Sequence, residues 1–152
     1  MKIFRTVENL SKSIGDFIPE FALNLAARLS VFMIFWLSAQ TKLGGESLWG
    51  QKWMFWNVAE NTFMLFEYEY ALPLIPANIA AYMATLAEFW LAIFVLLGLF
   101  TRTSALMLII ITLVIQIFVY PGSWAQHLLW LVPLVYLLKE GGGQLSLDRK
   151  IT

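Results

Sequence analysis

Two long apolar runs, at residues 76–100 and 104–120, dominate the middle of the sequence. About twenty mostly apolar residues are needed for a helix to cross the hydrocarbon of a bilayer, and both runs are long enough. The short linker at residues 100–103 would make the two helices an antiparallel pair. Glu88 lies in the middle of the first run, and Gln116 is the one strongly polar residue of the second. A carboxylate at membrane depth is costly and marks an ion pair or a functional site, so we expect a buried partner for Glu88.

The composition indicates an integral membrane protein. Hydrophobic residues make up 60% of the 152 and charged residues only 13%, whereas soluble globular chains are roughly one-quarter charged. Ten basic residues balance ten acidic ones, so net charge does not favour a nucleic-acid partner. There is no cysteine, which excludes disulfides and iron–sulfur clusters. No removable signal peptide is evident, and we expect the first spanning helix to act as an uncleaved insertion signal.

We predict an all-α fold, a single membrane domain over residues 1–152 built as a four-helix bundle. The four spans are expected at residues 21–43, 76–100, 104–120 and 123–139, the last one kinked at Pro133. Residues 1–18 alternate apolar and charged positions at helical spacing, which predicts an amphipathic helix lying on the membrane surface; packing on a soluble neighbour is the alternative. Residues 44–75 form an aromatic-rich outer loop of short interfacial helices. Residues 140–152 form a polar cytoplasmic tail, and Gly141–Gly143 is expected to be a helix stop with a flexible exit.

The first span carries an unusual polar stripe. Asn24, Arg28, Ser38 and Lys42 fall at steps that place them on one helix face. Lipid cannot satisfy these groups, so the stripe should face the bundle interior.

The distribution of charge predicts the orientation. Basic residues at positions 2–12, 102 and 139–150 fall on one side of the predicted spans, and only Lys42 and Lys52 fall on the other. Cytoplasmic loops carry an excess of Lys and Arg, so both termini should be cytoplasmic. The aromatic loop and the turn at Pro121 then face outward.

Comparing depths suggests a partner for Glu88. At about 1.5 Å of rise per residue, Glu88 and Gln116 lie roughly 18 Å from the inner side and Arg28 roughly 10 Å. A guanidinium on its long stem can bridge most of that difference. We therefore expect Arg28 and Glu88 to pair inside the bundle, with Gln116 or Asn24 adding hydrogen bonds. Such a pair could fix helix register only, or it could belong to a ligand or proton site.

A second polar group is expected near the outer side, beneath the aromatic loop: Gln40, Lys42, Gln126 and His127. His127 could donate to a quinone carbonyl or shuttle a proton, or it could simply bond a neighbouring group. One histidine cannot supply the two axial ligands of a bundle-bound b-type haem, so haem is not expected. Copper held by His127 with Met33 or Met83 is chemically conceivable, but no Met-x-x-Met or His-Met spacing supports it.

Four stretches in order, FEYEYALPLIP (66–76), AEFWLAIFVLLGLFTRTSAL (87–106), VIQIFVYPGSWAQHLLW (114–130) and GGGQLSLD (141–148), resemble the DoxX family of small bacterial membrane proteins. The resemblance covers roughly the last ninety residues strongly and the first span more loosely. In place of the family's Gly-Pro-Gly, this chain has glycine at position 142. The polar positions associated with the family are matched by Arg28, Lys42, Glu88, Arg102 and His127.

The resemblance implies a four-helix bundle in the bacterial inner membrane with both termini in the cytoplasm. The family is named for a subunit associated with a thiosulfate:quinone oxidoreductase, and other relatives accompany oxidative-stress or metal-handling proteins. We therefore expect a quinone-associated membrane subunit, at most one subunit of a quinone-linked oxidoreductase. The alternatives are a non-catalytic module that anchors a protein partner and, more weakly, a small-solute or proton conduit, which would need a homo-oligomer.

Overall fold

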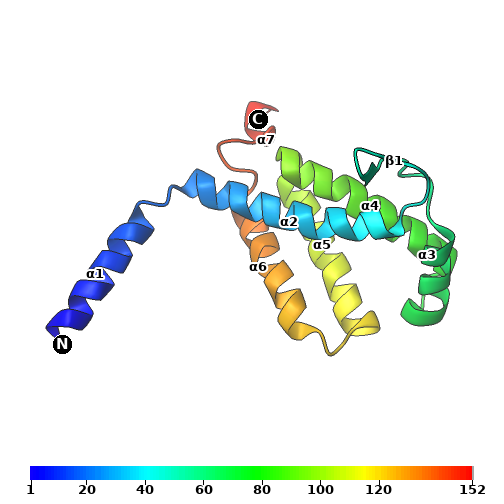
Figure 1. The fold of residues 1–152 in the computed structure, drawn as a ribbon, viewed down its shortest axis with the longest axis horizontal. Helices are drawn as coiled ribbons and strands as arrows, with labels where there is room; N and C mark the ends of the chain where they lie inside the picture. Colours follow the sequence, from blue (N-terminus) through cyan, green and yellow to red (C-terminus); the bar gives the residue numbers. More distant parts are fainter. Residues whose placement is uncertain (152) are drawn as a thin grey trace.

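A computed structural model describes residues 1–151 and is almost entirely helical (Figure 1). Three helices are long and apolar enough to cross a membrane: Glu20–Lys42 (α2), Ala77–Leu97 (α4) and Thr101–Val119. The last of these consists of α5 (Thr101–Val114) and a π-helical continuation, η2 (Ile115–Val119). A further helix, α6 (Trp124–Glu140), has 17 residues. These lengths are typical of helices that cross a bilayer or come close to its full thickness.

The helices α2, α4, α5 and α6 contact one another in a closed ring. Helix α2 contacts α4 and α6, and α5 likewise contacts α4 and α6. Their shared interior contains an apolar cluster in which Val31, Val95, Leu108 and Leu134 are all 0% exposed. The outward faces are also apolar, and Val132 on α6 is 68% exposed. Apolar residues on both the inner and outer faces suit helices whose surroundings are lipid.

The turn between α4 and α5 lies earlier than predicted. Helix α4 ends at Leu97, Gly98 takes a left-handed conformation (φ +67°), and α5 begins at Thr101. The predicted linker at residues 100–103 is therefore wrong, since three of its four residues are helical. The reason lies outside the local sequence: Asp148 accepts hydrogen bonds from the backbone N–H groups of Phe100 and Thr101 and so caps the start of α5.

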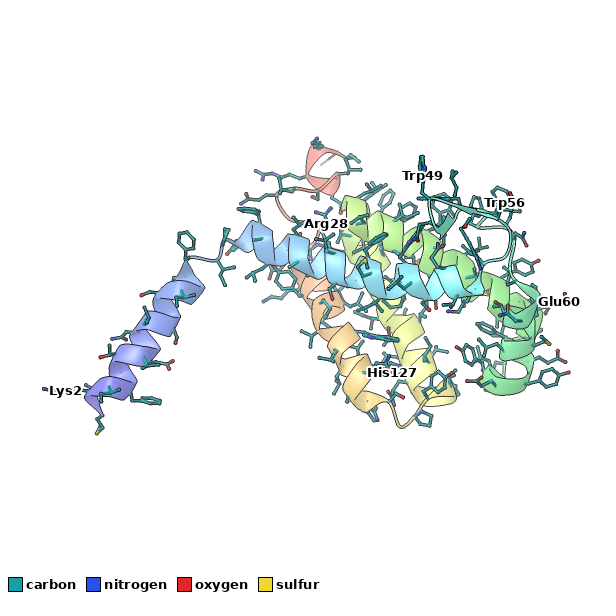
Figure 2. All side chains as sticks on the ribbon, viewed as in Figure 1. Lys2, Arg28, Trp49, Trp56, Glu60 and His127 are labelled. Atoms are coloured by element: carbon teal, nitrogen blue, oxygen red, sulfur yellow. The ribbon has the colours of Figure 1, made fainter. Side chains whose placement is uncertain are left out.

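Helix α1 (Lys2–Asp16) has no buried residue and extends away from the other helices (Figures 1 and 2). Its apolar residues form one exposed face, on which Ile3 is 82% and Leu10 62% exposed. The segment from Phe17 to Pro19 joins α1 to the start of α2. The helix is strongly amphipathic, as predicted, and its apolar face contacts no other described part of the chain.

The outer loop is not composed of helices alone, contrary to the prediction. Its first half is a small hairpin, β1 (Ser47–Leu48) paired antiparallel with β2 (Gln51–Lys52). Trp49 and Gly50 at its tip both have positive φ, and Trp49 is 89% exposed (Figure 2). Two consecutive residues with positive φ make the tight turn that matches strand twist, which periodicity alone did not reveal.

The second half of the loop is helical, with α3 (Glu60–Met64) continuing into a π-helix, η1 (Leu65–Tyr70). The loop packs on the membrane helices through aromatic rings: Trp53 contacts Trp36, and Phe55 contacts Phe89. Helix α6 continues from Trp124 through Pro133 to Glu140. The chain ends in the short helix α7 (Asp148–Ile151).

Candidate functional site

The polar stripe on α2 faces inward, as predicted. Asn24, Arg28 and Lys42 are 4%, 3% and 6% exposed. The stripe nevertheless serves two separate sites, because the fully buried Val31 and the nearly buried Phe35 lie between its two ends. The first site is at the end of α2 that leads into the outer loop, and the second is at the end nearest the C-terminal tail.

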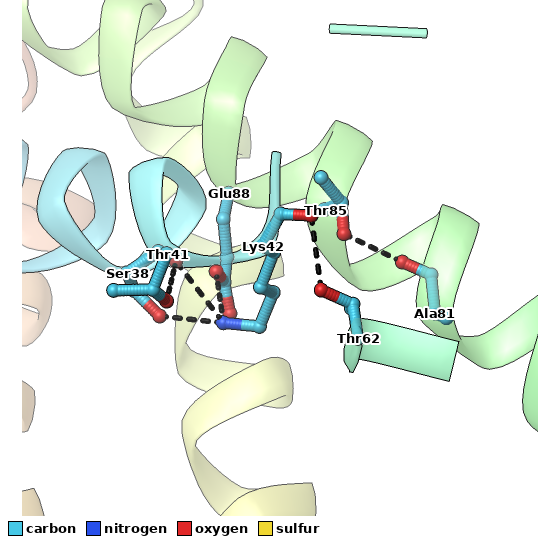
Figure 3. Close-up of polar contacts among 7 residues, drawn as sticks. All are labelled: Ser38, Thr41, Lys42, Thr62, Ala81, Thr85 and Glu88. Carbon is cyan, nitrogen blue, oxygen red and sulfur yellow. Dashed lines mark hydrogen bonds and ion pairs between the residues drawn. The ribbon is translucent and has the colours of Figure 1, made fainter. Parts of the chain in front are cut away.

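At the loop end, Lys42 forms a buried ion pair with Glu88 of α4. The two side chains point toward each other (Figure 3), with 2.7 Å between Lys42 Nζ and Glu88 Oε2. Lys42 Nζ also donates to Ser38 Oγ at 2.7 Å. The backbone carbonyl of Lys42 accepts from Thr62 Oγ1 at 3.0 Å, which ties α3 to this end of α2. The cation is thus fixed both by the carboxylate and by its own helix.

The predicted pair between Arg28 and Glu88 is wrong. Arg28 instead donates to backbone carbonyls, reaching Val95 O at 2.9 Å, Leu145 O at 2.8 Å and Gly142 O at 3.2 Å, and it also bonds Leu96 O. Side chains on a helix lean toward its N-terminus. In α2 this tilt takes Arg28 away from Glu88, toward the end of α4, and carries Lys42 down to Glu88.

The C-terminal tail is folded against the membrane helices, so the prediction that the chain after Gly141–Gly143 is flexible is wrong. Asn24, which was expected to support Glu88, donates to Gly141 O at 2.8 Å. Gly143 has φ +71°, and a Cβ there would lie 2.6 Å from Asn24 Cγ. With the capping carboxylate of Asp148, these contacts lock the tail onto the ends of α2, α4 and α5. The Arg28 site is therefore structural, because the guanidinium satisfies helix-end carbonyls.

A cavity of about 140 Å³ adjoins the Lys42–Glu88 pair. It combines polar groups with aromatic and aliphatic walls from α2, η1, α4, α5, η2 and α6. Its lining consists of Ile34, Phe35, Ser38, Lys42, Phe66, Tyr70, Ala84, Glu88, Ile111, Ile115, Tyr120, Gln126, His127 and Trp130. The structure therefore brings together three of the predicted outer residues, Lys42, Gln126 and His127, and adds Glu88 to them.

Gln116 and His127 form a hydrogen-bond network at the edge of this cavity. The Gln116 amide nitrogen donates to Pro121 O at 2.7 Å. A carbonyl can only accept, so this bond places Gln116 Oε1 toward His127 Nδ1, 2.6 Å away. Oε1 is also only an acceptor, so Nδ1 must carry the proton. Gln116 was expected to support Glu88, but it orients His127 instead.

The network fixes what His127 can offer a ligand. In a neutral imidazole with the proton on Nδ1, Nε2 is a hydrogen-bond acceptor. Within residues 1–151 no hydrogen bond to Nε2 is found, and His127 lines the cavity. Within the same residues no hydrogen bond to Glu88 Oε1 is found either, because the ion pair with Lys42 engages Oε2. The cavity thus offers two acceptors. The donation to a quinone carbonyl that was expected of His127 would need a second proton on its ring.

One predicted member lies elsewhere, and aromatic members were missed. Gln40 binds the backbone of Lys52, donating to its carbonyl at 3.1 Å and accepting from its N–H at 2.6 Å. It anchors the hairpin and does not line the cavity. Phe66, Tyr70 and Tyr120 do line it, from or beside the two π-helices η1 and η2. Single-turn π segments are frequent at functional sites but have no simple sequence signal.

Tyr120 connects the cavity to η1. Its hydroxyl donates to Glu69 Oε1, and its ring makes an edge contact with Tyr70. The hydrogen bond to Glu69, followed by desolvation, raises the pKa of Tyr120. The phenol therefore stays protonated and holds η1 against the end of η2.

A model of the DoxX family matches residues 23–121, about two-thirds of the chain. The match includes Lys42 and Glu88 and ends before Gln126, His127 and the tail stretch 141–148. Neither the curated proteins nor the solved structures contain a significant match to this chain.

Proposed function

The chain belongs to the DoxX family and is a membrane protein, and from this premise we propose that it is a quinone-associated membrane subunit. The proposal places the ligand's ring in the cavity between Lys42, Glu88 and His127. The chain would bind the quinone, and a partner subunit would supply the redox centre that exchanges electrons with it.

The observation that carries the proposal is the combination of polar and apolar groups around one small cavity. Ligand sites typically have apolar and aromatic walls with a few convergent polar groups. Here Trp130 and Phe35 supply flat walls, while Glu88 and His127 supply the polar contacts. The volume of about 140 Å³ is close to that of a known cavity of about 150 Å³ that binds benzene. A single six-membered ring therefore suits the space.

The available hydrogen-bond groups favour the reduced, hydroxyl-bearing form of the ring. A quinol offers two O–H donors, and the cavity offers His127 Nε2 and Glu88 Oε1 as acceptors. Lys42 engages Glu88 Oε2, which leaves Oε1 for the ligand. A quinone carbonyl needs a donor, which the Nε2 of a neutral imidazole with its proton on Nδ1 does not supply. The site therefore favours the quinol form.

Extraction of the purified protein tests the proposal. We expect a quinone to co-purify from native membranes with the wild-type protein, detected by mass spectrometry, and added quinol to quench tryptophan fluorescence through Trp130. Glu88→Gln and His127→Ala should lose both signals. Gln40→Ala is the matched control, because that amide lies outside the cavity, and it should retain them. Absence of quinone and of quenching in the wild-type protein would refute the proposal.

A second candidate is a non-catalytic module that binds a protein partner through the hairpin. It is favoured by Trp49, which is 89% exposed at the hairpin tip on a backbone with φ 55°. Strained and exposed aromatic positions are typical of recognition sites. Pull-down from native membranes tests it: a stoichiometric partner lost in Trp49→Ser but kept in His127→Ala supports this role. Recovery of no stoichiometric partner would exclude it.

The proposed topology is a four-span protein of the bacterial inner membrane with both termini in the cytoplasm. The cavity then opens toward the outer side, and α1 lies along the inner surface with its apolar face in the lipid. The chain has no cysteine, so single introduced cysteines report sidedness directly. In intact cells an impermeant maleimide should label Trp49→Cys and spare Gln144→Cys. The reverse pattern would overturn this orientation.

A conduit through one copy of the chain has no comparable support. On α2, Val31 and Phe35 lie between Arg28 and Lys42, and both belong to the buried apolar cluster of the core.

A further inference from the structure

An apolar groove lies beside the polar cavity. It has a volume of about 270 Å³ and runs between α4 and the α5–η2 helix, with η1 at one end. Its walls include Ala80 and Ala87 on α4 and Val114 on α5. Small side chains on α4 leave room between the two helices, which larger residues would fill.

The groove and the cavity are continuous. Four residues line both of them: Phe66, Tyr70, Ala84 and Ile111. The charged groups and the histidine line the cavity alone. In the groove, Tyr70 is the only lining residue with a polar side-chain atom. At its far end the groove reaches the outer faces of the helices, where Met83 is 57% and Ile110 53% exposed. A single path thus leads from a polar, ring-sized space to the apolar surface of the helices.

We propose that this groove holds the apolar tail of the ligand whose ring occupies the cavity, so that the ligand is a lipid-tailed quinol that enters sideways from the bilayer. This inference rests on the proposed function for the identity of the head. The occupant is a tail and not a protein segment because the groove is narrow and ends in a polar cavity of only about 140 Å³. A strand of a partner could not place backbone in the apolar groove without leaving its polar groups unsatisfied. A helix, about 10 Å across, is too wide for a groove of about 270 Å³.

The arrangement also explains the position of the two π-helices. Phe66 and Tyr70 lie on η1, and Val119 of η2 lines the groove. The junction between cavity and groove is therefore bordered by the two segments in which the α-helical hydrogen-bond pattern is broken. π-helical segments are frequent at functional sites, which fits a junction that the ligand occupies.

Photolabelling tests the tail site in the wild-type protein. The probe is a benzoquinol with a decyl chain that carries a diazirine near its middle, and the protein is held in lipid nanodiscs. We expect cross-links to concentrate in residues 80–87 and 110–119, with excess tail-less benzoquinol competing them away. An alkyl diazirine without the ring should label the outer faces of all membrane helices and resist this competition.

A matched pair of variants gives a second readout. Val114→Phe fills the groove and should reduce the competed labelling about tenfold, since overpacking a close-packed site excludes the tail. Met107→Phe is the control, because Met107 lies two turns away on the same helix face, is 49% exposed and lines no part of the groove. Tail-less quinol should bind both variants as it binds wild type, measured by quenching of tryptophan fluorescence.

The two proposals fail in different ways. If tail-less quinol binds but the diazirine labels all outer helix faces equally, the tail site is wrong and the proposed function stands. If Val114→Phe is labelled as fully as the control Met107→Phe, the tail site is also wrong. If wild-type protein binds neither tailed nor tail-less quinol, the proposed function falls, and this inference falls with it.

Discussion

Removing one charge of the Lys42–Glu88 pair should be among the most damaging single substitutions in this chain. In Glu88→Gln the shape of the side chain is kept, but the Lys42 ammonium loses its counter-charge while remaining buried. Its remaining partner would be Ser38, through Oγ at 2.7 Å and the carbonyl at 3.4 Å. Neither group carries a charge, so the cation would be left uncompensated.

The size of the effect follows from the geometry. At 2.7 Å and an effective dielectric constant of about 20, the attraction between the two charges is about 6 kcal/mol, from which desolvation must be subtracted. Breaking a buried pair by removing one partner costs about 3–5 kcal/mol. We therefore expect Glu88→Gln to raise the unfolding equilibrium constant by roughly a hundred- to several-thousand-fold.

The assay is reversible unfolding in mixed micelles, followed by circular dichroism, with a double-mutant cycle. Glu88→Gln, Glu88→Leu and Lys42→Met should each lose about 3–5 kcal/mol. The double variant Lys42→Met/Glu88→Leu should recover most of the loss, since apolar replacement of a buried pair is often neutral. The control cycle joins Arg28→Met with Glu88→Gln and should show coupling below about 0.5 kcal/mol, because the two residues share no partner. Additive losses for Lys42 and Glu88, or strong coupling between Arg28 and Glu88, would refute the assignment.

Three further predictions concern the tail and the outer edge of the cavity. Asp148→Ala should lower the free energy of unfolding by about 1–2 kcal/mol, because two backbone N–H groups at the start of α5 lose their acceptor; a melting temperature equal to wild type would contradict the capping role. Gly143→Ala should be destabilising by more than about 1 kcal/mol, since φ is +71° and the added Cβ meets Asn24, whereas Gly122→Ala, with no atom within 4 Å, should be nearly neutral. Because the pKa of Tyr120 is raised by its bond to Glu69, the protein should lose stability as the pH rises above about 10, where the unfolded phenol ionises and the folded one does not. Glu69→Gln should bring the latest tyrosine transition in an absorbance titration to lower pH, and an unchanged titration would count against the bond.

The sequence was sufficient for the three helices that are long and apolar enough to cross a membrane and for the face that α2 buries. Apolar runs and the spacing of Asn24, Arg28 and Lys42 depend on local periodicity, which a single sequence displays directly. It also predicted that Glu88 must have a buried cation. It did not identify Lys42 as that cation. The predicted depths of the residues were those of their Cα atoms, and they left out the lean of side chains toward the helix N-terminus.

The rest of the site depends on contacts between residues distant in sequence. Arg28 is satisfied by carbonyls at Val95 and Leu145, and Asp148 caps a helix that begins 47 residues earlier. A polar tail that follows three glycines has no local pattern that predicts its folding against the membrane helices. The π-helical segments that border the cavity were likewise not predictable. A short change from α-helical to π-helical hydrogen bonding leaves the pattern of apolar residues in the sequence nearly unchanged.

The most direct test of the ligand site uses the fact that His127 is the only histidine in the chain. Protein labelled with ¹⁵N-histidine gives the two ring nitrogens of this residue without interference. We predict that Nδ1 carries the proton and keeps its chemical shift when quinol is added, whereas Nε2 shifts as it accepts the quinol hydroxyl. An Nε2 signal that does not move at saturating quinol, or a proton found on Nε2 in the neutral ring, would contradict the account.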